Sequence, residues 1–182
     1  GGNKGLNLGT AGGIPNLVIQ NCFFVNFIGG TFPTGVVITG SSLIPGHVSH
    51  NTFVSCGTGL GSDTPVTGIN NLFDRNTSDI EDTVAFDKSL WTGNQSSTES
   101  PSGWPASNDY GVTWVATFVD PGTDDYHLVT GSMGENAGVA NGVSVDYDGD
   151  SRPQGGGYDR GADEIIPAGT ATSTPVLSIT DS

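Results

Sequence analysis

The pentapeptide SHNTF at residues 49–53 recurs as INNLF at residues 69–73 and as IQNCF at residues 19–23. In each copy an asparagine precedes a phenylalanine by two positions. The repeated asparagines, which are 30 and then 20 residues apart, are Asn21, Asn51 and Asn71. Repeats of this length are typical of stacked supersecondary units, in which equivalent residues lie above one another.

The apolar runs around these copies are short, roughly three to five residues, and are bounded by Gly, Asn, Ser or Pro, which favours strands and tight turns. We therefore predict an all-β fold, a right-handed parallel β-helix whose coils stack at about 4.8 Å. Phe23, Phe53 and Phe73 would form an internal aromatic stack. The repeated asparagines would form an amide ladder at a turn, where Asn tolerates left-handed backbone. The alternative is a β-sandwich, whose strands would be longer and more evenly alternating.

The composition agrees with short strands and many turns. The chain has 182 residues, of which 29 are Gly, and its hydrophobic share is 34%, so long helices are not expected. The net charge of −14, with only five Lys and Arg, argues against a nucleic-acid partner and is typical of an acidic, secreted surface. The sequence contains no run of 18 apolar residues, so no membrane-spanning helix is predicted. Because the chain begins at Gly1 without Met, we interpret its N-terminus as processed or trimmed.

The two cysteines, Cys22 and Cys56, lie in apolar, strand-like runs. Two cysteines do not make a disulfide framework, so buried free thiols are the expected state. A single disulfide between them is the alternative in an oxidising compartment.

The loop that follows the repeats is long and rich in Ser, Gly, Asn and Pro, and it contains Trp91 and Trp104. The two indole rings could stack on sugar rings, or they could pack against the side of the coils. The sequence thus divides into coils, loop, closing segment and linker-like tail, with the boundaries 1–88, 89–117, 118–166 and 167–182.

A series of short motifs in the last third is characteristic. They are FVDP at 118–121, DYHL at 125–128, GSM at 131–133, NAG at 136–138 and DYDGDSRPQGGGYDRGADE at 146–164. In this order they resemble the closing segment of bacterial right-handed parallel β-helix repeat proteins of the pectate-lyase-like superfamily, of the choice-of-anchor Q type. Met133 stands where that pattern has Pro, and Arg160 where it has an apolar residue. The resemblance implies an irregular C-terminal capping segment over the end of the β-helix, in which Arg152 pairs with a nearby carboxylate.

Asp146, Asp148 and Asp150 alternate like the start of a calcium loop. The twelfth position from Asp146 holds Gly157 and not Glu, which excludes an EF-hand. A Ca²⁺ site of another geometry and a solvated acidic turn paired with Arg are the two remaining interpretations.

The resemblance also raises the question of catalysis. Polysaccharide lyases of that superfamily need an Arg or Lys base beside carboxylate-bound calcium, and here only Asp74, Arg75 and Lys88 give such a set. No Arg-x-Lys of the related hydrolases and no G-x-S-x-G motif occurs.

We therefore expect a noncatalytic extracellular or cell-surface module with a structural, adhesive or assembly role, which could bind polysaccharide. A polysaccharide lyase or glycoside hydrolase, or a fragment of one, is the alternative. No amphipathic helix precedes the first strand-like residues. The expected partner of the first coil is therefore another copy of the chain, or the rest of a longer surface protein.

Overall fold

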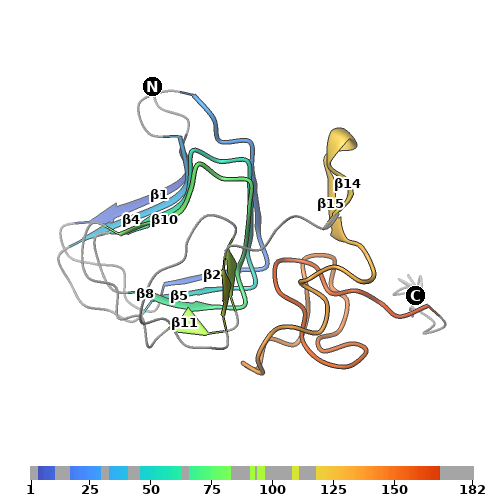
Figure 1. The fold of residues 1–182 in the computed structure, drawn as a ribbon. Coiled ribbons are helices and arrows are strands. Elements are labelled where there is room, and N and C mark those ends of the chain that lie inside the picture. Colours follow the sequence, from blue (N-terminus) through green and yellow to red (C-terminus); the bar gives the residue numbers. More distant parts are fainter. Residues whose placement is uncertain are drawn as a thin grey trace, which may run out of the picture.

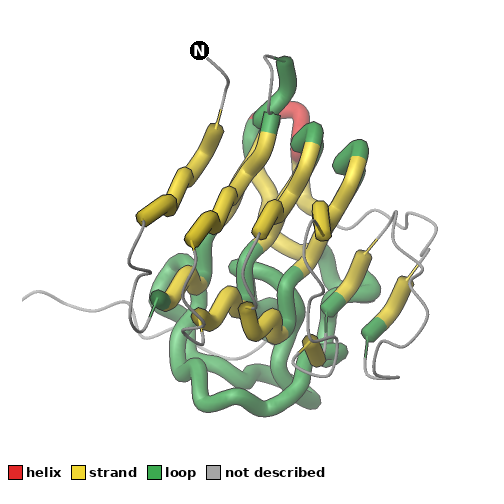
Figure 2. The backbone as a smooth tube through the Cα atoms, turned by 90° about the vertical axis from the view of Figure 1, so that its left-hand side faces the viewer, coloured by secondary structure: helices red, strands yellow, loops and turns green. Residues whose placement is uncertain are grey.

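The structure is a computed structural model, and strands stacked in parallel dominate it. It describes residues 4–10, 17–29, 33–40, 46–62, 66–82, 91–92, 94–96, 108–110 and 118–168. Figure 2 shows the strands side by side as successive rungs, and Figure 1 looks along the stack.

Three parallel sheets form the walls of the stack. Sheet A has the order β1 (Lys4–Thr10), β4 (Thr34–Gly40), β7 (Thr58–Ser62), β10 (Ser78–Asp82). Sheet B has the order β11 (Trp91–Thr92), β8 (Val66–Ile69), β5 (Gly46–Ser49), β2 (Val18–Gln20). Sheet C has the order β13 (Asp109–Tyr110), β12 (Gln95–Ser96), β9 (Leu72–Asp74), β6 (Thr52–Val54), β3 (Phe23–Val25). The chain visits sheets B, C and A in turn, and each strand pairs in parallel with its equivalent in the next coil. The predicted parallel β-helix is confirmed.

Left-handed backbone at two positions in each coil bends the chain from one sheet to the next. The residues between sheets B and C have φ between 50° and 55°, and they are Asn21, His50 and Asn70. The residues between sheets C and A have φ between 52° and 58°, and they are Asn26, Ser55 and Arg75. Asn adopts this conformation more readily than most residues, which explains why it recurs at the turns.

An amide ladder runs through the first of these turns, one residue after the left-handed position. The Asn71 side chain accepts hydrogen bonds from the backbone N–H and the side-chain amide of Asn51, each at 3.1 Å. Asn94 does the same for Asn71, and Asn108 does it for Asn94. The amides of Asn51, Asn71 and Asn94 also donate to a backbone carbonyl of the preceding coil, as from Asn71 to Val48 at 2.7 Å. The ladder is therefore internally satisfied over four coils.

The predicted membership of Asn21 in this ladder is wrong. Strand pairing aligns Cys22, and not Asn21, with Asn51, and the Cys22 N–H donates to the Asn51 side chain at 3.1 Å. The Cys22 thiol donates to the Gln20 carbonyl, as the Asn51 amide donates to the Ser49 carbonyl. The Asn21 side chain instead donates to the Val145 carbonyl.

Cys56 lies at a second asparagine position, between sheets C and A. Its backbone N–H donates to the Asn76 side chain at 2.8 Å, and its thiol lies 3.5 Å from the Phe24 carbonyl. Both cysteines are free, and each thiol takes the place of an amide in the coil stack. Burial raises the pKa of the Cys56 thiol to about 11, so it is an unreactive structural group.

The aromatic stack also differs by one residue from the prediction. Phe24, Phe53 and Phe73 stack inside, with centroid distances of 5.0 and 4.8 Å and nearly parallel rings. Phe23 lies on the outer face of sheet C, because successive side chains of a strand point to opposite faces. Gly59 faces the stack from sheet A, where a Cβ would lie 2.9 Å from the Phe73 ring.

The coils extend beyond residue 88, where the sequence predicted their end. β11 adds to sheet B, and β12 and β13 add to sheet C. Asn94 and Asn108 carry the ladder into this region, within what was expected to be a loop.

Residues 118–168, hereafter the closing segment, begin with an antiparallel hairpin of β14 (Phe118–Asp120) and β15 (Asp125–Leu128), joined by the 3₁₀ turn η2 (Pro121–Thr123). The rest is irregular, as expected. However, the closing segment lies beside the coils and not over their end (Figure 1). Its hydrogen bonds reach the corner residues of successive coils, from Asn21 through His50 and Asn70.

The outer face of sheet C and the closing segment share a second apolar core. Val54 and Leu72 of the sheet pack there with Phe118, Tyr126 and Leu128. This contact buries β6 and β9 on both faces, which explains why every residue of these strands is buried.

Among the residues that the structure describes, there is no helix with the length and apolarity that a membrane span requires.

Replacing Phe53 by Ala should lower the free energy of unfolding by about 3–5 kcal/mol, because it opens a cavity between two stacked rings. Phe23→Ala should cost clearly less, since Phe23 is only partly buried on the outer face. Urea unfolding followed by circular dichroism measures both losses. Equal losses would contradict the register that places Phe24, and not Phe23, inside.

Candidate functional site

The closing segment has only isolated bridges after Leu128, so its backbone N–H groups need acceptors outside a sheet. Buried carboxylates supply many of them. Asp146 accepts from the amides of Asp148, Asp150 and Glu164; Asp159 from those of Asn136 and Ile165; Asp163 from that of Leu128; and Glu164 from those of Gln154 and Asp159. The acidic residues of this segment thus act first as a framework for irregular backbone.

A fully buried ion pair lies at the centre of this framework. Arg152 Nη1 donates to Glu164 Oε2 at 2.8 Å, and both side chains are 0% exposed. Arg152 Nη2 also donates to the Gly161 carbonyl at 2.9 Å. Such a pair needs further hydrogen bonds to both groups. Glu164 accepts two backbone N–H groups, and both Nη atoms of Arg152 donate, whereas the buried Arg152 Nε has no hydrogen-bond partner among the described residues. The expected pairing of Arg152 with a carboxylate is confirmed.

Arg160 is the second buried cation of the segment. It is 4% exposed and forms an ion pair with Asp109 of β13. Arg160 therefore links the closing segment to the last described coil.

The three aspartates predicted as a calcium site lie in one loop but have separate roles. Asp146 is 4% exposed, and both of its carboxylate oxygens accept backbone N–H groups. Asp148 is exposed and bonds to His127. Burial, with the charges of Asp146 and Asp148, raises the pKa of Asp150. Calcium binding by this set stays a prediction.

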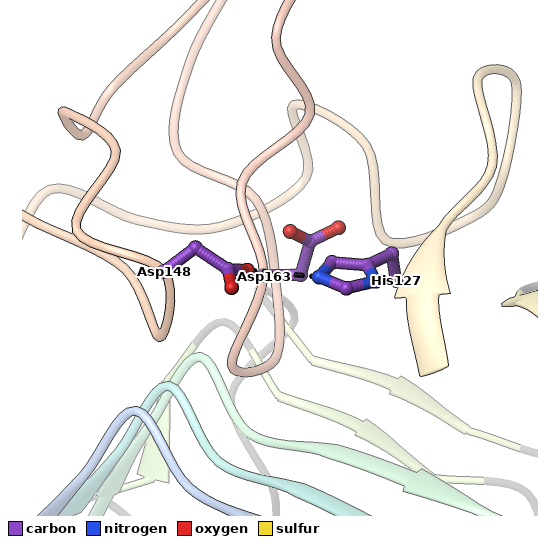
Figure 3. Close-up of side chains that lie close together, drawn as sticks. All are labelled: His127, Asp148 and Asp163. Atoms are coloured by element: carbon purple, nitrogen blue, oxygen red, sulfur yellow. Dashed lines mark hydrogen bonds and ion pairs between the residues drawn. The ribbon is translucent and has the colours of Figure 1, made fainter. Parts of the chain in front are cut away.

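Four side chains from three parts of the closing segment converge at its surface, and we call Asp125, His127, Asp148 and Asp163 the His127 cluster. His127 Nδ1 lies 2.6 Å from Asp125 Oδ1, and His127 Nε2 lies 2.8 Å from Asp148 Oδ2. Figure 3 shows the imidazole of His127, on β15, pointing toward the Asp148 and Asp163 carboxylates. Asp163 is buried, whereas His127 and Asp148 are exposed.

The electrostatics of the cluster are dominated by its carboxylates. Hydrogen bonds to Asp125 and Asp148 raise the pKa of His127 to about 9 against a smaller opposing effect of burial. Burial raises the pKa of Asp163 to about 6. The hydrogen bonds from His127 lower the pKa of Asp125. One imidazole thus faces three carboxylates.

Among the described residues, one group of at least three His, Cys, Asp or Glu side chains could hold a metal ion, and it belongs to this cluster. The donor atoms of His127, Asp148 and Asp163 all lie within 4.8 Å of one another.

Of the three candidate catalytic residues, the structure joins two. Arg75 Nε lies 3.0 Å from Asp74 Oδ1, and the Asp74 side chain is 1% exposed. Burial raises the pKa of Asp74 to about 6. Asp79 lies inside the coils, bonded to Asn76 and Ser96. Lys88 lies outside the described residues, so a groove shared with it stays a prediction.

The sugar-stacking prediction is equally open. The backbone of Trp91 pairs with Gly68 in sheet B, and its side chain is not among those described. Trp104 lies outside the described residues.

The His127 cluster was not recognised as a site from the sequence. The spacing of Asp125 and His127 does place both on one face of a strand, which is a usable signal. Asp148 and Asp163 are too distant along the chain to be assigned by spacing.

His50 is a buried histidine outside this cluster. Its side chain is bonded to Asn70 and to Asn141, so it connects the coils to the closing segment. Burial is the main cause that lowers the pKa of His50 to about 4.

Comparison with protein-family models, with curated proteins and with solved structures finds no match to this chain. The resemblance stated from the motifs of residues 118–164 therefore stays a prediction.

Replacing Arg152 by Ala should lower the free energy of unfolding by about 3–5 kcal/mol, because Glu164 would remain as an uncompensated buried charge. Arg75→Asn is the matched control. It also removes an arginine from an ion pair with a buried carboxylate. However, Arg75 itself is exposed, burial raises the pKa of Asp74 to about 6 so that this carboxylate can take up a proton, and Asn tolerates the left-handed backbone at position 75. A clearly smaller loss than for Arg152→Ala is therefore expected. Chemical unfolding measures both, and a loss below about 1 kcal/mol for Arg152→Ala would refute the framework role of the pair.

Proposed function

We propose that the chain is a noncatalytic β-helix module of an extracellular or cell-surface protein, with a structural, adhesive or assembly role. The observation that carries this proposal is the stack of parallel coils, whose outermost described strands can pair with a further coil of the same protein or of another chain. β1, β2 and β3 are the outer strands of sheets A, B and C, and no described strand pairs with their outer sides. An edge of this kind is a template for pairing with another chain.

The side chains at this end are also less covered than their equivalents further in. Leu6 and Leu8 of β1 are partly buried, whereas their partners Val36 and Ile38 are 0% and 5% exposed. Val18 of β2 is 58% exposed and faces outward from sheet B, as its exposed partner His47 in β5 does, so it is an accessible position on this edge strand. Another coil stacked on this end would cover apolar surface and pair the open backbone groups at the same time.

The opposite end of the stack supports a second copy of the chain as the partner. There β10, β11 and β13 are the outer strands of the same three sheets, within the part of the chain that the structure describes. Parallel edges offer the same hydrogen-bonding pattern, so one end of a copy fits the other end of the next copy. Contacts of this head-to-tail kind build rings or open filaments.

The acidic character of the chain supports an extracellular setting and a soluble surface. The carboxylates of the closing segment mostly accept backbone N–H groups, which is a structural use of charge. The two candidate catalytic residues that the structure describes, Asp74 and Arg75, form an ion pair with each other, and the Asp74 carboxylate is buried. This favours a structural role for them as well.

Sedimentation at increasing concentration tests the assembly. The unmodified chain should form larger species, and Val18→Lys should reduce them at least about tenfold, because a charge on an edge strand opposes pairing. Val119→Lys is the matched control: Val119 is 54% exposed and lies in β14, which pairs with β15 and belongs to none of the three coil sheets. A stable monomer at all concentrations, or equal effects of both substitutions, would refute self-assembly through this end.

Incubation with pectate and alginate tests the noncatalytic part of the proposal. No unsaturated product should form, as monitored by ultraviolet absorbance. Product formation that Asp74→Asn abolishes would overturn the proposal in favour of a polysaccharide lyase.

A further inference from the structure

We propose that the His127 cluster is a binding site for a divalent transition-metal ion, with His127 Nε2, Asp148 and Asp163 as ligands. The three donors come from β15, from the loop of residues 146–150 and from the stretch before Ile165, so an ion would join three parts of the closing segment (Figure 3).

Asp163 is a buried carboxylate with few hydrogen bonds. This carboxylate is 6% exposed, and the one hydrogen bond that it accepts from a described residue runs from the Leu128 amide to Oδ2. Its other oxygen, Oδ1, accepts from no described donor and is therefore available to a further positive partner. The nearest cationic group, His127, is bonded to Asp125 and Asp148 instead.

The charge balance points the same way. Asp125, Asp148 and Asp163 surround a single imidazole, and the charge of Asp146 also acts on Asp163. Arg152, the other cation near this region, is paired with Glu164. A divalent cation would offset the excess negative charge that the side chains leave uncompensated.

Asp125 supplies the orientation that a metal-binding histidine requires. Its carboxylate accepts from His127 Nδ1 at 2.6 Å, which leaves Nε2 directed at Asp148 and Asp163. Metal-binding histidines almost always donate their second ring N–H to a carboxylate or carbonyl in this way. The Asp163 carboxylate accepts the Leu128 backbone N–H, and the Asp146 carboxylate accepts the Asp148 backbone N–H, so both acidic ligands are also held in place.

The ligand set selects the class of ion. Calcium takes six to eight oxygen ligands, whereas mixed imidazole and carboxylate ligands suit zinc and its neighbours. Tetrahedral zinc with bonds of about 2.1 Å places its ligand atoms roughly 3.4 Å apart. On binding, the Nε2 proton that His127 shares with Asp148 is released to solvent, and the ion takes its place. His127 Nε2 and Asp148 Oδ2 would therefore separate slightly from 2.8 Å, and both side chains are exposed.

Calorimetric titration with ZnCl₂, after dialysis against EDTA and then metal-free buffer, tests the site. The unmodified chain should bind one zinc ion, and the bound form should melt at a higher temperature, because an ion that binds only the folded state stabilises it. His127→Ala and Asp148→Asn should each weaken zinc binding at least about tenfold, and Asp125→Asn by about 10–100-fold through loss of orientation.

Two control variants separate ligation from general effects. His47→Ala removes another exposed histidine, in β5, and Asp124→Asn removes one negative charge beside the cluster. Both should bind zinc within about twofold of the unmodified chain, which sets them apart from the ligand variants. His127 and Asp148 are exposed, so their variants should fold, as circular dichroism will verify.

The proposal is overturned if the unmodified chain binds zinc no more tightly than His127→Ala, or if His47→Ala abolishes binding equally. Saturable calcium binding that raises the melting temperature, resists His127→Ala and is not displaced by zinc would also overturn it. That result would favour the oxygen ligands of Asp146, Asp148 and Asp150.

Discussion

In-register stacking of parallel coils is the constraint on which the rest of this structure depends. When each strand pairs with its equivalent in the next coil, every side chain lies on an equivalent side chain, so an interior polar group must be satisfied by a copy of itself. Asparagine meets this condition because its amide both donates and accepts along the stack. A single such hydrogen bond contributes only about 1 kcal/mol, but one left unmade inside costs about 1–3 kcal/mol, so the ladder enforces the register of all three sheets. Cys22 follows Asn51 in the ladder, and Cys56 follows Asn76 at the second asparagine position; a thiol needs fewer partners than an amide.

The turns that the ladder stabilises also position the closing segment. Left-handed backbone at Asn21, His50 and Asn70 directs their side chains outward, where they bond to Val145, Asn141 and Val139. One coil after another thus contributes a polar contact at the same corner. The apolar outer face of sheet C provides the remaining contact area, with Val54 and Leu72 under the hairpin.

The closing segment shows how a chain can bury acidic residues without a sheet. Its carboxylates accept the backbone N–H groups that a strand partner would otherwise accept, and Arg152 compensates the most deeply buried of them. Where this framework meets the surface, at His127, three carboxylates face one imidazole. The same concentration of charge that orders the backbone therefore creates the place where a cation fits best.

The sequence by itself determined the fold, because the asparagine and phenylalanine repeat is a direct image of the stacking constraint, and it indicated the irregular closing segment. It could not determine the register of the first coil. IQNCF offers Asn21 and Phe23 at the repeated spacing, yet Cys22 and Phe24 occupy those positions, since a one-residue shift is decided by which side chains the core accepts. Nor could it show that Asn94 and Asn108 continue the ladder after unequal loops. Only the tertiary structure decided where the closing segment lies and which residues meet at His127. Those contacts join segments that carry no periodicity, and their partners are fixed by packing against the flank of the coils rather than by any spacing along the chain.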